Sequence, residues 1–158
     1  MKAIKAILYW ILHIIWAAPT FLIGAVVSLF MLMTGHKPHR FGCTFYFTVK
    51  FVKNCGCEFG PMFVLADNCS ASLHMKQHEH GHGIQALIFG PITLFVVSLP
   101  SIIRFWYREL KERKMVKKLA KQKITAKELV DWYRTVPEYE SIWFEAQATK
   151  LGEKYFLE

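Results

Sequence analysis

The stretch His78-Glu79-His80-Gly81-His82 is the most informative part of this sequence, because it fits the pattern H-E-x-x-H. On an α-helix, residues i and i+4 share a face about one turn apart, so the imidazoles of His78 and His82 can reach one ion. Zinc binds imidazole nitrogen at about 2.0–2.1 Å. Glu79, on the neighbouring flank, is placed to act as general base on a metal-bound water. The pattern therefore predicts a helix with a zinc site on one face, and a His-rich surface helix is the alternative.

A catalytic zinc site needs a third protein ligand. His74 lies on the same helical face, but eight residues rise roughly 12 Å, so His74 and His82 cannot both bind one ion at about 2 Å. Our choice is Glu145, which has small and apolar neighbours on a predicted C-terminal helix. Glu138 and Glu140 remain rivals.

An ordered set of short motifs surrounds this pentapeptide. The set comprises Gly60-Pro61-Met62-Phe63-Val64, the HEHGH segment with Gln85 after it, Phe89-Gly90-Pro91-Ile92, Leu99-Pro100-Ser101-Ile102 and Ile142-Trp143-Phe144-Glu145. In this order, over roughly residues 42–152, they resemble a group of small bacterial metallopeptidase-like domains of the gluzincin type, some found in secreted toxins. The pattern of that group is GPF-(strand)-HEYGH-x-x-Q-(L)GP-(I)PS-(F)WTE.

This resemblance implies a zinc site with His78, His82 and Glu145 as ligands and Glu79 as the base. The sequence departs from the pattern close to Glu145. Phe144 stands where the pattern has Thr, and Gln147 and Thr149 replace an acid or amide. A long basic insert, about residues 104–136, precedes the last motif.

A long apolar segment lies at the N-terminal end. Ala6–Gly35 contains no Asp, Glu, Lys or Arg, and as a helix it would measure roughly 45 Å, more than the ~30 Å hydrocarbon core requires. We therefore expect residues 1–35 to be a transmembrane anchor helix, with a possible bend near Pro19, rather than a signal peptide or a buried core helix. Residues 36–158 then form the metallopeptidase-like domain.

The rest of the chain predicts a mainly helical α+β fold. Phe41–Val52 and Phe59–Leu65 are rich in aromatic and β-branched residues, and the turn residues between them favour a short β-hairpin. The second of these strands could be an edge that pairs with an extended substrate. Thr125 and Glu128 match a capping box, and a last helix is expected over Glu138–Glu153.

A second apolar stretch, Ile84–Ile103, is interrupted by Gly90-Pro91 and Pro100. One crossing of a bilayer by this stretch would leave the histidine pair and Glu145 on opposite sides. We therefore expect it to be re-entrant or interfacial.

A basic segment follows directly, predicted as a helix to about Lys121. It has a net charge of +7, with Glu109, Glu112 and Glu128 set against ten basic residues: Arg104, Arg108, Lys111, Arg113, Lys114, Lys117, Lys118, Lys121, Lys123 and Lys127. A basic segment next to an apolar one is typical of contact with anionic headgroups on the cytoplasmic face, so we expect lipid rather than nucleic acid as its partner. A solvated helical face is the alternative. The four cysteines (Cys43, Cys55, Cys57 and Cys69) contain no C-x-x-C pair, and reduced thiols are expected.

Together these features predict a membrane-associated zinc metallopeptidase that hydrolyses peptide bonds in a peptide or protein substrate. Its expected place is a bacterial cytoplasmic membrane, with the catalytic unit on the cytoplasmic side. Two alternatives are a metal-binding membrane protein without catalysis and a membrane-anchored interaction protein.

Overall fold

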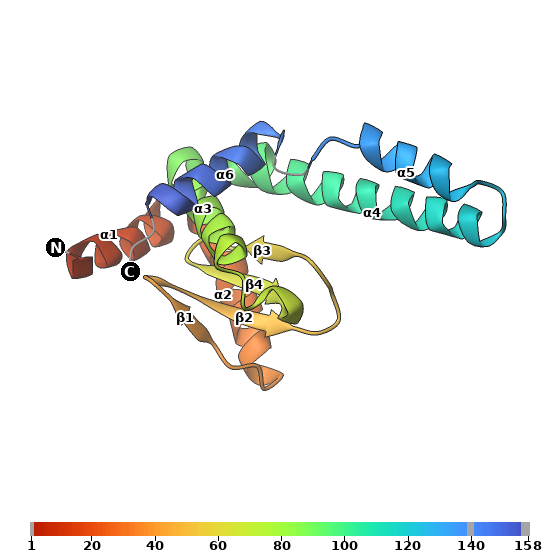
Figure 1. The fold of residues 1–158 in the computed structure, drawn as a ribbon. Helices are drawn as coiled ribbons and strands as arrows, with labels where there is room; N and C mark the ends of the chain where they lie inside the picture. The colour runs from red at the N-terminus through yellow and green to blue at the C-terminus, as the bar shows by residue number, and fades with distance from the viewer. Residues whose placement is uncertain (1, 139–140, 156–158) are drawn as a thin grey trace.

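The computed structural model places a set of helices against a small mixed β-sheet, so the expected mainly helical α+β fold is confirmed (Figure 1). The structure describes residues 2–138 and 141–155. The helices are α1 (Lys2–Ile15), α2 (Ala18–Met33), α3 (Leu73–Phe89), α4 (Leu99–Ala120), α5 (Ala126–Thr135) and α6 (Trp143–Lys154). The strands are β1 (His39–Phe41), β2 (Thr44–Val49), β3 (Gly56–Glu58) and β4 (Met62–Ala66). Three short turns complete the chain: η1 (Asp67–Cys69), η2 (Gly90–Ile92) and the π-helical η3 (Leu94–Ser98).

The sheet has the strand order β1-β2-β4-β3. The predicted hairpin between Phe41–Val52 and Phe59–Leu65 is wrong, because the strands within these segments, β2 and β4, pair in parallel. Each is instead one arm of its own tight hairpin, β2 with β1 and β4 with β3. The β3–β4 turn passes through Gly60, whose positive φ of 76° suits glycine. No strand was expected at Gly56–Glu58. This short segment forms β3, the hairpin partner of β4.

The N-terminal segment, for which one helix bent near Pro19 was expected, forms two helices. Helices α1 and α2 meet at an angle of 99° at a break around Trp16 and Ala17. Pro19 lies in the first turn of α2, where its missing N–H costs nothing and its ring favours the start of a new helix. Among the described helices none is by itself long and apolar enough to cross a bilayer, although α1 with α2, and α3 with α4, pass that test as bent pairs.

The apolar stretch Ile84–Ile103 reverses the chain direction. It includes the end of α3, passes through η2 and η3, and continues into α4 with a bend of 115° in all. Gly90 ends α3 with a positive φ of 58°, as the Gly90-Pro91 break predicts. Pro100 does not break the chain, because it lies in the first turn of α4, so the basic helix begins inside the apolar stretch rather than at Arg104.

The basic insert forms a helical hairpin. In Figure 1, α4 extends away from the rest of the molecule and α5 returns beside it. The predicted capping box is confirmed, since Thr125 accepts a bond from the Glu128 backbone and the Glu128 carboxylate accepts one from the Thr125 backbone. The last helix starts at Trp143, later than expected, after Ile142 in extended conformation.

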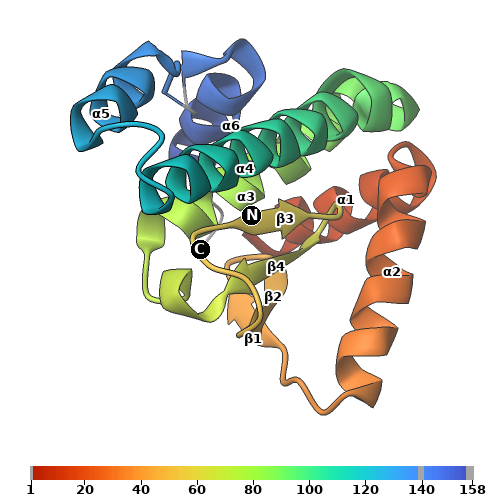
Figure 2. The same cartoon turned by 90° about the vertical axis from the view of Figure 1, so that its right-hand side faces the viewer.

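The closest packing in the molecule joins α3 to α6, which lie side by side in Figures 1 and 2. A Cβ at Gly81 would overlap the carbonyl oxygen of Ala148, and a Cβ at Gly152 would overlap that of Gln77. Each helix thus presents a glycine to the backbone of the other. This reciprocal contact brings α6 onto the face of α3 that carries His78 and His82.

We expect Gly81→Ala to destabilise the protein by about 3 kcal/mol, because the two helices must separate to accept the methyl group. The gain of about 1 kcal/mol in helix propensity is smaller. Thermal unfolding followed by circular dichroism in mild detergent measures the change. Gly35→Ala is the matched control, since its added methyl would meet nothing within 4 Å and only its backbone, at φ +82°, would be strained. Equal losses in the two variants would contradict the packing argument.

Candidate metal centre

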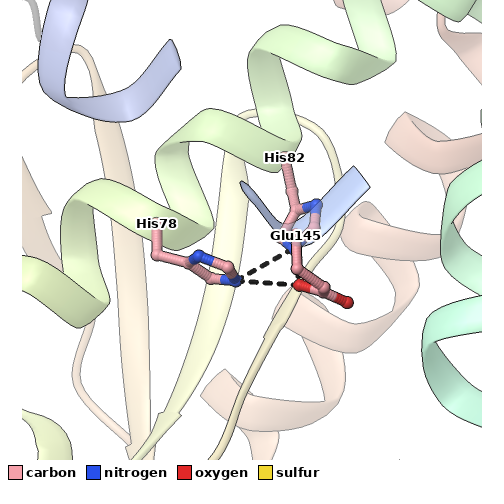
Figure 3. Close-up of side chains that lie close together, drawn as sticks. All are labelled: His78, His82 and Glu145. Atoms are coloured by element: carbon pink, nitrogen blue, oxygen red, sulfur yellow. Dashed lines mark hydrogen bonds and ion pairs between the residues drawn. The ribbon is translucent and has the colours of Figure 1, made fainter. Parts of the chain in front are cut away.

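Three side chains from two helices converge at one point (Figure 3). The Nε2 atoms of His78 and His82 lie 3.1 Å apart, and each lies 3.1 Å from Oε2 of Glu145. All three residues are buried, with exposed fractions of 5%, 8% and 0%. The structure thus brings together the three residues that the sequence analysis singled out as ligands.

The spacing of these atoms fits a metal ion. Ligands about 2.0–2.1 Å from a tetrahedral ion lie roughly 3.3 Å from one another, close to the separations observed here. Two imidazole nitrogens and one carboxylate oxygen form a donor set that suits zinc and neighbouring divalent transition metals. Three protein donors also leave one tetrahedral position for water or substrate.

The rival ligands lie elsewhere. His74 is exposed on the first turn of α3. It does not belong to the cluster, as expected from the rise of the helix between His74 and His82. Glu138 is exposed in the segment before α6. Glu140 lies outside the described residues. The cysteines are free thiols and none joins the His78–His82–Glu145 cluster.

Gln85 orients His82. The amide nitrogen of Gln85 donates to the carbonyl oxygen of Phe144 at 2.7 Å and to Oε1 of Gln147 at 2.9 Å. Since a backbone carbonyl only accepts, Oε1 of Gln85 must be the atom 2.7 Å from Nδ1 of His82. Nδ1 therefore carries a proton and donates it to Gln85, which leaves Nε2 to face the metal position.

Thr149 holds the imidazole ring of His78 in a similar way. Its hydroxyl lies 2.9 Å from Nδ1 of that imidazole. Thr149 is one turn beyond Glu145, so a ligand and a partner of a ligand share one face of α6. The positions that depart from the family pattern, Gln147 and Thr149, thus supply hydrogen bonds that hold the histidine pair.

Ser101, from the first turn of α4, donates to Oε1 of Glu145 at 2.6 Å. Burial by itself would raise the pKa of Glu145. Hydrogen bonds from His78, His82 and Ser101 outweigh this effect and hold that pKa well below its usual range. Burial alone would lower the pKa of His82, but its hydrogen bond to Glu145 and the carboxylates of Glu79 and Glu58 raise it to about 9. A bound cation would take the place of the proton that His82 shares with Glu145.

Glu79 is buried beside this cluster and is not one of its three members. Burial raises the pKa of Glu79, and the nearby imidazoles of His78 and His82 lower it in part. Its carboxylate packs against strand β3, where a Cβ at Gly56 would overlap Oε1 of Glu79. A buried carboxyl with a raised pKa next to a metal site is a candidate for proton transfer.

A half-buried carboxyl that the sequence did not reveal, Glu58 on β3, also lies near this site. Burial raises its pKa to about 8, the charge of Glu79 adds to this effect, and the backbone N–H of Gly60 donates to its side chain. Nothing in the local sequence marks Glu58, because only the β3–β4 hairpin brings it toward α3. Ser101 was quoted within a motif, and its contact with Glu145 depends on the chain reversal before α4.

Comparison of the chain with models of protein families, with curated proteins and with solved structures finds no match. The geometry of the His78–His82–Glu145 cluster and of Glu79 is therefore the basis for any functional proposal.

We expect Glu145→Ala to lose its metal, because two imidazoles alone bind a divalent ion weakly. The parent should hold one ion per chain and the variant below about 0.1. Elemental analysis after purification in mild detergent provides the measurement. Glu138→Ala is the matched control and should bind metal like the parent; a loss in that variant instead of Glu145→Ala would refute the ligand assignment.

A second expectation concerns Gln85→Leu. Without the amide, the His82 ring loses the acceptor that fixes its orientation, and metal affinity should fall about 10–100-fold. Titration with a competing chelator measures this affinity. His74→Leu replaces an exposed polar side chain of the same helix that does not belong to the cluster, so it should leave the affinity unchanged. Equal affinities for both variants would show that Gln85 does not orient His82.

Proposed function

We propose that this chain is a membrane-associated zinc metallopeptidase. The observation that carries the proposal is the convergence of His78, His82 and Glu145 at mutual distances of 3.1 Å, with the buried carboxyl of Glu79 beside them. Zinc bound there would lower the pKa of a bound water and polarise the carbonyl group of the scissile bond. The resemblance to small gluzincin-type domains supports the same assignment.

Glu79 is the proposed general base. Burial raises its pKa, which makes its carboxylate a stronger base, and it can take a proton from water and return it to the leaving amine. Glu145 cannot do this, because its two oxygens are engaged by the histidines and by Ser101. The two buried glutamates thus differ in role because they differ in partners.

Strand β3 is the proposed place for an extended substrate. The earlier expectation of an edge strand at Phe59–Leu65 is wrong, because β4 lies between β2 and β3. In the described sheet β3 has the outer position and carries Gly56 against Glu79. A peptide paired with its outer edge would run past the proposed base.

The proposed location is the bacterial cytoplasmic membrane, with residues 36–158 on the cytoplasmic side. Many large apolar side chains of α1 and α2 are exposed, and the basic segment 104–127 follows an apolar stretch. Anionic headgroups would attract that basic segment.

We expect Glu79→Gln to lower hydrolysis by ~10²–10⁴-fold, since the amide keeps the shape of the side chain but cannot accept a proton. Metal content should stay at the parent level. Cleavage of an internally quenched mixed-sequence peptide measures the rate, and Glu153→Gln, exposed on α6, is the control.

A Glu79→Gln variant as fast as the parent would refute the mechanism. A parent that binds metal but cleaves no peptide would favour the alternative of a metal-binding membrane protein without catalysis. A parent without metal would leave only the interaction protein.

A further inference from the structure

The two N-terminal helices have an inverted amphipathic pattern. Small and polar residues of α2 face the protein, with Thr20, Gly24 and Ser28 buried, while on α1 the buried positions include His13. The outward side of α2 carries large apolar side chains: Leu22, Ile23, Val26, Leu29 and Phe30. A helix that faces water shows the opposite arrangement. Small residues toward the protein and apolar ones outward are typical of helices in lipid.

The α1–α2 corner lies against the reversal between α3 and α4. The indole N–H of Trp16 donates to the carbonyl of Leu87 at 3.1 Å, and the Trp16 ring packs so closely on Gly90 that a Cβ there would overlap it. Figure 2 shows both corners on the same side of the molecule as α2. Exposed apolar side chains continue across them, notably Ile15, Ile92 and Phe95. An apolar surface of this extent indicates a partner.

The exposed side chains of helix α4 indicate how far such a partner would extend over the molecule. Its exposed side chains are aliphatic in the first turns (Leu99, Ile102, Ile103), then aromatic (Trp106, Tyr107), and in the rest of the helix mostly basic (Lys111, Arg113, Lys114, Lys117, Lys118), with Leu110 and Val116 among them. Hydrocarbon, an aromatic belt and anionic headgroups favour these three classes in the same order. Leu99 and Trp106 lie about 10 Å apart along the axis, similar to the depth that interfacial helices reach.

The metal centre lies at the apolar end of this helix. Ser101, between Leu99 and the aromatic residues, donates to the ligand Glu145. It precedes Trp106 by about 8 Å along α4. The helix α2, at about 24 Å, is too short to cross a hydrocarbon core of ~30 Å, which favours entry into one leaflet.

We propose that a lipid bilayer covers the apolar face formed by α2, the two corners and the first turns of α4, which insert into one leaflet. The metal centre then lies on the hydrocarbon side of the boundary with the headgroups, near that boundary. This placement also assigns a substrate class, and that assignment rests on the proposed peptidase function. The substrate would be a membrane-bound polypeptide, cleaved within a few residues of the bilayer.

Flotation tests the placement without reference to activity. The full chain is reconstituted with vesicles of phosphatidylcholine and phosphatidylglycerol and floated in 1 M NaCl, where the Debye length of about 3 Å removes most electrostatic binding. Phe95→Glu should lower the partition coefficient about tenfold. Phe51→Glu is the matched control, because Phe51 is also highly exposed but lies on the loop after β2. Equal flotation of both variants would overturn the placement.

Peptides tethered to a lipid through spacers of two lengths test the depth of the metal centre and the substrate class. One peptide sequence is offered free, or tethered to a lipid through a spacer of about 2 or about 15 residues, each spacer residue reaching at most about 3.5 Å. The inference expects the short-spacer peptide to be cleaved at least as fast as the long one, and at least tenfold faster than the free peptide. Cleavage of the long-spacer peptide alone would overturn the assigned depth.

The two experiments separate the two proposals. A chain that floats but cleaves none of the three peptides refutes the peptidase and, with it, the substrate class, while the bilayer placement stands. A chain that cleaves the free peptide but does not float in high salt refutes the placement alone. Phe95→Glu should keep the cleavage of the free peptide and lose the preference for the tethered one.

Discussion

The close approach of α3 and α6 is the constraint on which the candidate site depends. Gly81 and Gly152 remove the side chains that would separate the two helices, and each lets a backbone carbonyl of the partner helix come near. A wider separation of the two helices would move Glu145 away from the two imidazoles and change the 3.1 Å distances between the three side chains. The metal cluster is thus a consequence of glycine placement as much as of the ligands themselves.

Hydrogen bonds across the same interface give the site its chemical definition. Phe144 and Gln147 fix the amide of Gln85, the amide fixes the proton of His82, and Thr149 holds His78. Helix α6 therefore serves two purposes, because it brings both a candidate ligand and the hydrogen-bond partners that orient the other two. Ser101 connects this arrangement to α4, so the first turn of that helix and the candidate metal centre are joined by a hydrogen bond.

The N-terminal helices are similarly part of the body of the molecule. His13 lies within hydrogen-bond distance of the Gly83 carbonyl, Trp10 donates to the Cys43 carbonyl, and Trp16 donates to that of Leu87. A simple tether would make no such contacts. On α2, small and polar side chains (Thr20, Gly24 and Ser28) point inward while large aliphatic ones are exposed, so the packing of this helix and its apolar outer face belong to one arrangement.

The sequence by itself determined the features that depend on local periodicity and on chemical type: the α3 helix, the i, i+4 histidine pair, the exclusion of His74 and the capping box at Thr125. Small and apolar neighbours favoured Glu145 over Glu138, and the order of several motifs supported the same choice. Only the tertiary structure decided the parallel pairing of β2 with β4, the 99° bend after α1, the raised pKa of Glu58 and the contacts of Ser101 and Thr149. These features join segments far apart in the chain, and such contacts arise from packing that residue spacing within one segment does not encode.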